Sequence, residues 1–497
     1  MGTIGDLLDR DLSQQIEEIV KVDQADEQAV HTELTEYVAT DRLRGQYRSI
    51  LKAIADSRAN PHEGIGVWVS GFFGSGKSYF AKNLGYVLSN QEVLGESASE
   101  LFKRQVEDQR VADFLDVINT QIPCEVIMFD VSVDTAIRHS TEQIAEIMYS
   151  VVLRELDYAT DFEVAELEIE LEEEDRLEEF VELCQELHGR PWTQVRKGAQ
   201  KISRASAVLH EIDPDTYPSA ESWAESLRDK RTDITVGKFV RRTFDLCARR
   251  RPGKAPIFII DEVGRYVSRS AAKIENLRAV VEQFGKEGKN RAAAGELVAP
   301  AWVIVTSQEK LDEVVSAIDS KRIELPHMQD RFKYRIDMAP ADIREVATVR
   351  VLSKTDDAVP VLRKLYQQNE GQLKAALQLE QTARGGQLTE EDFIRFYPYP
   401  PHFIELCIDI MSGLRVASPG VMRQLGGSNR TIIKQAYEML VSDRTDFASK
   451  PVGRLVTLDQ VYELVEGNFT TEKAKDISDI ERRIEEKGSG GREARPA

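Results

Sequence analysis

The segment from Gly71 to Ser78, which reads GFFGSGKS, constrains this chain more than any other feature. It fills the pattern GxxxxGK[ST] with Gly71, Gly76, Lys77 and Ser78, and Gly74 adds a further glycine. Glycines let the backbone turn tightly, so that successive N–H groups point inward at phosphate oxygens. A helix that begins there adds the positive end of its dipole. The segment therefore predicts a loop that cradles nucleotide phosphates.

The flanking residues place this loop between a strand and a helix. Ile65 to Val69 (IGVWV) is short, apolar and rich in β-branched residues, and Tyr79 to Leu88 has the apolar spacing of a helix. We expect Lys77 to contact the β- and γ-phosphates of ATP and the Ser78 hydroxyl to coordinate Mg²⁺. The predicted nucleotide contacts are Gly71, Phe72, Phe73, Gly74, Ser75, Gly76, Lys77, Ser78 and Tyr79.

A second apolar strand ends in an acidic pair. Ile257 to Ile260 (IFII) is a continuous apolar run, typical of a strand buried on both faces, and Asp261 and Glu262 follow it. Asp261 is the expected partner of the hydrated Mg²⁺, and Glu262 is the candidate that orients and polarises the attacking water. A glutamate in this position favours hydrolysis over transfer to a small molecule, because a kinase must keep water away from the γ-phosphate.

Further residues are candidates for sensing the γ-phosphate. Thr306, Ser307 and Gln308 follow the apolar strand WVIV and are expected at the carboxyl edge of the sheet, with Thr306 or Ser307 favoured as the sensor. The alternative is that these residues only cap the next helix.

Two arginines are also candidates. Arg331 lies where an arginine finger for a neighbouring subunit could begin, although it could equally pair with Asp330 or another carboxylate. Arg430, in GGSNRTII, could reach the γ-phosphate when a helical lid closes.

Strand-like and helix-like segments alternate from the P-loop to about Leu352, which predicts an α/β fold with a mostly parallel sheet and helices on both faces. The predicted layout is a helical lead-in (1–55), a P-loop NTPase core (56–352), an α-helical lid (353–445), and a helical segment with a flexible tail (446–497). Within the core, the acidic stretch 162–231 is predicted to be a helical insertion, because its aliphatic residues are regularly spaced. It would be either a partner surface or a solvated helix pair.

Charge and cysteine content narrow the functional classes. A net charge of -20 means that the chain as a whole would be repelled by nucleic acid, so any DNA contact must be local. One candidate is the basic run between Arg228 and Lys254, which could also be a solvated helix face. The four cysteines form no CxxC pair, so neither a zinc site nor a disulfide framework is indicated. With no long apolar stretch, we expect a cytoplasmic protein outside the membrane.

About the first 440 residues resemble a known family, most specifically in the N-terminal ninety. IVKVDQADEQAVHTELTEYVAT and, above all, GVWVSGFFGSGKSYFAKNLGYVLSN (Gly66 to Asn90) closely resemble the large P-loop ATPase of BREX bacteriophage-defence systems, the BrxC/PglY family. That family has a core similar to AAA+ or ORC-like ATPases. The resemblance implies a Walker A set at the P-loop, a Walker B pair at Asp261 and Glu262, and weaker matches of Arg331 to a finger and Arg430 to a second sensor. Members are usually much longer than this chain.

The resemblance also implies partners. BREX ATPases act with an adenine-specific DNA methyltransferase, a PglZ-type protein and small accessory proteins, and together these methylate host DNA and block phage DNA replication. The leading hypothesis is an ATP-driven switch or motor in such a complex, forming a homo-oligomer and contacting DNA indirectly if at all. The alternatives are an AAA+ loader that binds DNA directly, a small-molecule phosphotransferase, and a nucleotide-bound scaffold that hydrolyses ATP slowly.

Overall fold

Five parallel strands form the centre of the protein. The computed structural model describes residues 2–13, 26–71, 75–131, 143–228, 234–267, 270–316, 325–377, 388–403 and 432–457, with positions 460, 475 and 479. The strand order is β4-β5-β6-β1-β7, and every pairing is parallel. The strands are β1 (Gly66–Ser70), β4 (Cys124–Asp130), β5 (Ala255–Asp261), β6 (Trp302–Ser307) and β7 (Tyr334–Asp337). The α/β fold predicted for a P-loop NTPase is confirmed.

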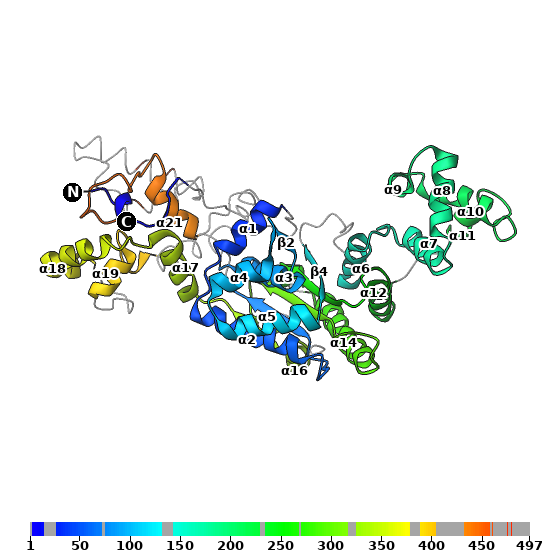
Figure 1. The fold of residues 1–497 in the computed structure, drawn as a ribbon, viewed down its shortest axis with the longest axis horizontal. Coiled ribbons are helices and arrows are strands. Elements are labelled where there is room, and N and C mark those ends of the chain that lie inside the picture. Colours follow the sequence, from blue (N-terminus) through cyan, green and yellow to red (C-terminus); the bar gives the residue numbers. More distant parts are fainter. Residues whose placement is uncertain are drawn as a thin grey trace.

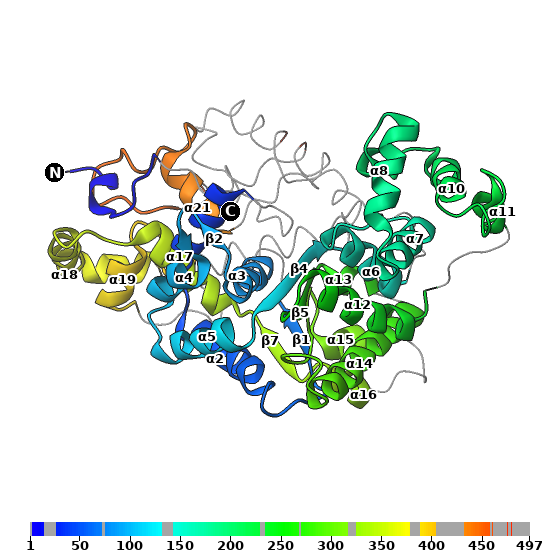
Figure 2. The same cartoon turned by 45° about the vertical axis from the view of Figure 1, so that its right-hand side comes forward.

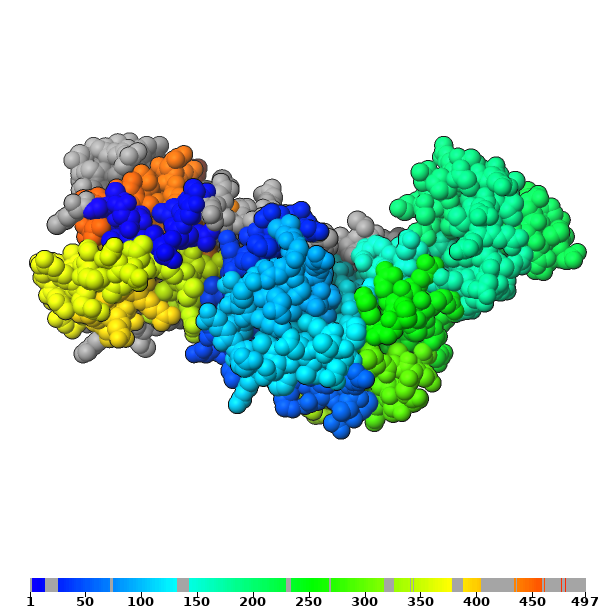
Figure 3. All heavy atoms as spheres, in the orientation of Figure 1, coloured from blue at the N-terminus to red at the C-terminus, as the bar shows by residue number. Residues whose placement is uncertain are grey.

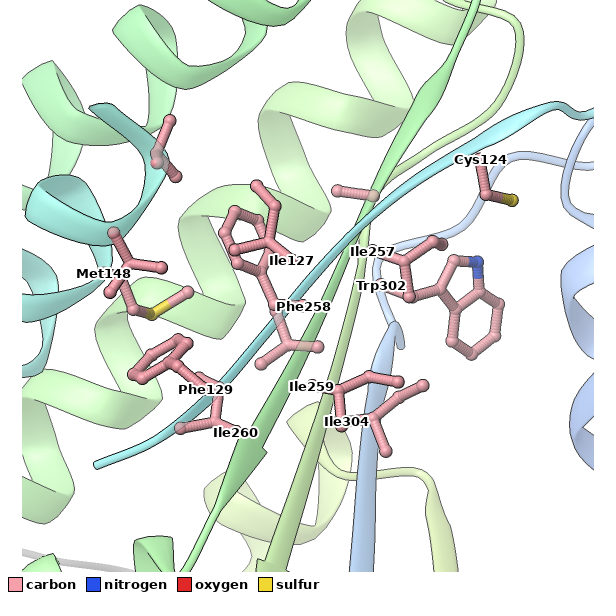
Figure 4. Packing of buried hydrophobic residues seen from close by; sticks show 14 of the residues in the cluster. Cys124, Ile127, Phe129, Met148, Ile257, Phe258, Ile259, Ile260, Trp302 and Ile304 are labelled. Atoms are coloured by element: carbon pink, nitrogen blue, oxygen red, sulfur yellow. The ribbon is translucent and has the colours of Figure 1, made fainter. Parts of the chain in front are cut away.

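Strand β5, an interior strand of the sheet, is buried on both faces, which explains its unbroken apolar sequence. All seven of its residues are buried. Ile260 lies with Phe129 toward Met148, whereas Ile259 and Ile304 lie on the opposite side of the sheet (Figure 4). A strand covered on both faces has no solvent side for polar residues, so alternation disappears from its sequence.

Helices cover both faces of the sheet (Figures 1 and 2). One group comprises α1 (Glu27–Thr35), α2 (Asp41–Asp56), α3 (Lys77–Ser89), α4 (Ala98–Val106) and α5 (Gln109–Gln121), with the hairpin β2 (Glu92–Val93) and β3 (Glu96–Ser97). The other comprises α6 (Ile144–Glu155), α12 (Val236–Arg250), α13 (Val263–Val267), α14 (Ala271–Ala293), α15 (Leu311–Ser316) and α16 (Leu325–Arg331).

The predicted insertion is helical and forms a lobe at one end of the molecule (Figure 3). It contains α7 (Phe162–Glu173), α8 (Leu177–His188), α9 (Trp192–Val195), α10 (Lys201–Ile212) and α11 (Ser222–Ser226). Its buried side chains include Phe180 and Trp192, whose rings meet edge to face at 5.0 Å, and they belong to the same hydrophobic cluster as the sheet.

The acidic and basic runs of the sequence neutralise each other. The guanidinium of Arg242 on α12 lies 3.0 Å from Glu166 and 3.1 Å from Glu173 on α7. Arg249 and Arg250, at the end of α12, pair with Glu172 at 3.3 and 2.7 Å. The basic run considered as a local DNA contact is therefore largely ion-paired within the chain. Its charges are distant from the acids in sequence, so only the packing of α7 on α12 could reveal the pairing.

A second hydrophobic core lies at the opposite end and is built from helices that follow the sheet. These are α17 (Pro340–Leu352), α18 (Ala358–Ala376), α19 (Glu390–Phe396) and α21 (Ile432–Val441). The first residues of the chain belong to this core: Ile4, Leu7 and Leu8 are buried in it, and the Ile4 amide donates to the Lys450 carbonyl at 2.9 Å.

The expectation of one helical lead-in over 1–55 is wrong for its first part. Residues Gly5–Leu7 form only a 3-10 turn (η1), and Leu8 makes a bridge with Lys354. Apolar spacing suited a helix, but these side chains are buried in the second hydrophobic core. The segments that follow α17 and α21 supply partners for the backbone, at Ser353 and at Ala448 and Lys450. The second part is helical, as α1 and α2. Among the described residues, no helix is both long and apolar enough to cross a membrane.

Replacing Gly285 on α14 with alanine should destabilise the protein by about 1–3 kcal/mol through overpacking. A Cβ there would meet the carbonyl oxygen of Glu63 and lie 3.1 Å from its carbonyl carbon, in backbone that leads into β1. Gly45→Ala is the matched control, because Gly45 lies within α2 and has nothing within 4 Å. That variant should gain up to about 1 kcal/mol in helix propensity. Urea unfolding measures both, and equal effects would contradict the prediction.

Candidate nucleotide-binding site

The P-loop joins the end of β1 to the start of α3. Strand β1 ends at Ser70, and α3 begins at Lys77 with Gly76 as its N-cap. Gly76 has φ of 87°, a left-handed conformation that favours glycine at this position. The predicted contacts Phe72, Phe73 and Gly74 lie outside the described residues.

The start of α3 offers donors for a phosphate. The first amides of a helix have no partner within it, and they carry the positive end of the dipole. Ser75 is buried, with an exposed fraction of 7%, and within the described part of the chain its hydroxyl has no hydrogen-bond partner. Lys77 is also buried, at 4% exposed. A buried hydroxyl without a partner is costly, so a phosphate oxygen bound here would fit these donors.

A carboxylate at the end of β5 links the end of β6 to the first turn of α3 beside this loop. Asp261 Oδ1 accepts a hydrogen bond from Ser78 Oγ at 3.0 Å and another from Thr306 Oγ1. The strand order explains the geometry, since β6 lies between β1 and β5 and all three end at the same edge. A hydroxyl and a carboxylate are hard oxygen ligands of the kind Mg²⁺ prefers when it keeps several waters. Ser78 and Asp261 therefore fit the predicted role in metal binding.

Glu262 is held beside this carboxylate by two contacts. Its backbone has φ of 58°, and its N–H donates to Thr306 Oγ1 at 3.0 Å. Its side chain accepts from Gln308 Nε2 at 3.2 Å. Burial raises the pKa of Glu262, the charges of Asp261 and Asp130 raise it further, and the charge of Lys77 opposes them. A carboxylate with a raised pKa is suited to proton transfer nearer neutral pH.

The sequence pointed only weakly to two residues of this edge. Asp130 ends β4 directly opposite Asp261 in the strand register, and its charge acts on Glu262. The sequence did indicate Asp130, because this acid ends the apolar run VIMFD. It could not indicate that Asp130 would pair with Asp261 in the sheet. Gln308 was considered with Thr306 and Ser307 as a phosphate sensor, and the structure shows it in contact with Glu262.

The hydroxyl groups of Thr306 and Ser307, the two favoured sensors, already make hydrogen bonds within the protein. Thr306 is fully buried, and its hydroxyl holds both Asp261 and the Glu262 amide. Ser307 is also buried, and its hydroxyl accepts from the Glu309 amide at 3.1 Å. This contact, from a side-chain hydroxyl to a backbone amide ahead of the next helix, is of the kind expected if these residues only cap that helix. Sensing of the γ-phosphate by Thr306 stays a prediction.

The remaining candidates lie apart from these residues or outside the description. The Tyr79 hydroxyl donates to the Glu33 carbonyl of α1. Arg331 precedes β7, so it lies at the amino edge of the sheet, opposite the P-loop. It contacts Glu63 at 3.5 Å and Glu282 at 3.4 Å. The chain therefore does not bring Arg331 to its own site, and a role in a neighbouring subunit stays a prediction. Arg430 lies outside the described residues.

Thr306→Val should destabilise the protein by about 1–3 kcal/mol, because it leaves the Glu262 amide and Asp261 without a buried hydroxyl partner. Thr306→Ser keeps the hydroxyl and is the control. Chemical unfolding measures both variants. Equal stability of Thr306→Val and the parent chain would show that this hydroxyl does not support the acidic pair.

Comparison with known proteins adds no argument for the fold or the function to what the structure shows. No protein-family model matches the sequence. A solved structure of the ORC1 protein of Aeropyrum pernix in complex with DNA is similar with a TM-score of 0.29 and 11% sequence identity. The match covers 88% of this chain and 86% of that chain.

Proposed function

We propose that this chain is a Mg²⁺-dependent ATPase. The observation that carries the proposal is the Asp261 carboxylate, which joins the first turn of the P-loop helix to the end of β6. Glu262 lies next to it with a raised pKa. A phosphate-binding helix start, a metal-binding pair and a candidate base thus meet at one edge of the sheet.

Different residues of the site would have different roles in ATP hydrolysis. The amides at the start of α3, with Lys77 and Ser75, would bind the phosphates and offset their charge. Mg²⁺, held by Ser78 and Asp261, would supply neutralisation of charge on the β- and γ-phosphate oxygens. Glu262 would orient the attacking water and accept its proton at a carboxylate oxygen. Gln308, which donates to Glu262 Oε2, would keep that carboxylate in place.

Glu262→Gln should bind ATP normally and lose hydrolysis by about 10²–10⁴-fold, because the amide keeps the shape but cannot accept the proton. Steady-state phosphate release and a nucleotide-binding titration measure the two properties separately. Glu178→Gln, on the exposed surface of α8, is the control and should retain both. Full hydrolysis by the Glu262 variant would exclude this residue as the base. A parent chain that binds ATP without turnover would favour the slow scaffold.

As the pH is lowered, the rate of ATP hydrolysis should begin to fall at a pH above the ordinary pKa of a glutamate. Because the folded-state pKa of Glu262 is raised, its carboxylate takes up a proton at a higher pH than usual and then cannot act as a base. A profile of kcat against pH under saturating ATP checks this. Gln308→Ala should move the acidic limb to still higher pH, since the amide favours the charged form of Glu262. An unshifted limb would contradict the assignment.

We also propose that this activity serves a BREX-type defence complex as a switch or motor. The support is the resemblance of Gly66 to Asn90 and the preceding N-terminal segment to the BrxC/PglY family. In that case the partners are a DNA methyltransferase, a PglZ-type protein, small accessory proteins and further copies of this chain. An AAA+ loader that binds DNA directly is the alternative. The ion-paired basic run on α12 argues against that alternative.

In a host that carries the defence system, Lys77→Ala should abolish phage protection, because the phosphates lose their buried cation. Plaque counts measure protection, and affinity purification from the same cells identifies the bound partners. Retained protection with a protein expressed at normal level would contradict a role for ATP in defence. DNA-stimulated turnover with a steep dependence on salt would instead support the loader.

A further inference from the structure

The connection between α1 and α2 lies against both the P-loop helix and the C-terminal helices. We call residues Glu33 to Arg42 the elbow. We propose that the elbow couples the nucleotide site to the C-terminal helices, with Arg42 and Asp342 as the positioning residues that transmit the change. This inference rests on the proposed function, since it requires that the P-loop bind ATP.

The first half of the elbow is fastened to the P-loop helix. The carboxylate of Glu33 accepts from Lys82 Nζ at 2.9 Å and from the Tyr86 hydroxyl at 3.0 Å, both on α3. Lys82 is fully buried and Glu33 is 6% exposed. Separating a buried ion pair leaves an uncompensated charge and is strongly unfavourable. We therefore expect α1 to move with α3 as one body.

The second half of the elbow is fastened to the first turn of α17. The carboxylate of Asp342, which is 5% exposed, accepts three hydrogen bonds. The donors are Thr40 Oγ1 at 3.0 Å, Arg42 at 3.0 Å and the Ala339 amide at 2.9 Å. A charge-assisted contact with this many donors holds its geometry well. The start of α17 thus follows the position of α2.

A third contact holds the other end of α17. Arg350, in the last turn of this helix, pairs with Glu36 at the end of α1. The elbow therefore contacts both the first turn and the last turn of α17. Ala347, Val351 and Leu352 of α17 are buried in the second hydrophobic core, together with side chains of α21. Figures 1 and 2 show α17 between the sheet and the other C-terminal helices.

The elbow also touches β7, which pairs with β1, the strand that enters the P-loop. Arg42 donates to the carbonyl oxygen of Asp337 at the end of β7. The carboxylate of Asp337 accepts from the hydroxyl of Ser70, the last residue of β1. The Met338 amide donates to the Ser70 carbonyl at 2.7 Å. A shift of the loop that follows Ser70 would therefore reach Arg42 through Asp337, and from there α17.

The test is hydrogen exchange of the full chain with and without Mg²⁺ and a non-hydrolysable ATP analogue. In the parent chain, analogue binding should change the exchange of α17 and α21. Arg42→Ala should bind the analogue with similar affinity. The effect of the analogue on hydrogen exchange in α17 and α21 should be smaller in this variant, by about fivefold or more. Its kcat should fall while its KM for ATP stays similar, because the site itself is intact.

Arg48→Ala is the matched control. Arg48 lies on the same helix and has a similar exposed side chain, 37% against 41% for Arg42. Its ion pair, at 3.4 Å, is with Asp108, which caps α5 within the core. A loss caused by general damage to α2 would appear in both variants. Arg42→Lys, which keeps a positive charge beside Asp342, should retain part of the coupling that Arg42→Ala removes.

The outcomes separate the two proposals. If the parent chain binds no nucleotide, the proposed function fails and this inference fails with it. If the parent binds the analogue but α17 and α21 exchange as before, only the coupling is excluded. If Arg42→Ala keeps the full response, or if Arg48→Ala loses it equally, Arg42 is not the positioning residue and the inference is overturned.

Discussion

The carboxylate of Asp261 is the contact on which the rest of the site depends. It lies at the end of a strand buried on both faces, and it accepts hydrogen bonds from the P-loop helix and from the neighbouring strand β6. A buried carboxylate is tolerable only when such donors surround it. The same Thr306 hydroxyl then holds the amide of Glu262, so one polar cluster determines where both acids lie.

Ion pairs also determine how the helical insertion is attached to the core. The net charge of -20 and the dense acidic stretch suggest a chain that repels nucleic acid. Yet the cations of α12 are gathered against the glutamates of α7, where they stabilise the attachment of the insertion to the core. Partly buried pairs in a network stabilise more than isolated exposed pairs, because the charges are screened less by solvent. The basic run is thus better explained by folding than by ligand binding.

The C-terminal helices are held to the core through polar contacts as well as through the chain. The elbow between α1 and α2 lies against α17, and the first residues of the protein are buried among the C-terminal helices. Among the residues that the structure describes, the two hydrophobic cores have no buried side chain in common. Movement of one body against the other would therefore break hydrogen bonds and ion pairs at α17, and would leave each apolar core intact.

The sequence by itself determined the α/β class, the P-loop and the acidic pair, because these depend on local patterns. A glycine loop between an apolar strand and a helix, and an acid after a buried strand, are short-range features that a single segment can reveal. The helical character of the insertion followed from spacing in the same way.

Only the tertiary structure decided which distant residues meet. Asp130 and Gln308 join Glu262 because of strand order and register, and Arg331 lies at the amino edge because it precedes a parallel strand. The apolar residues of the N-terminal segment fitted a helix of the nucleotide core, but they are buried among the C-terminal helices. Local periodicity reports that a side chain will be buried; which partner buries it depends on long-range packing, and that information is distributed over the whole chain.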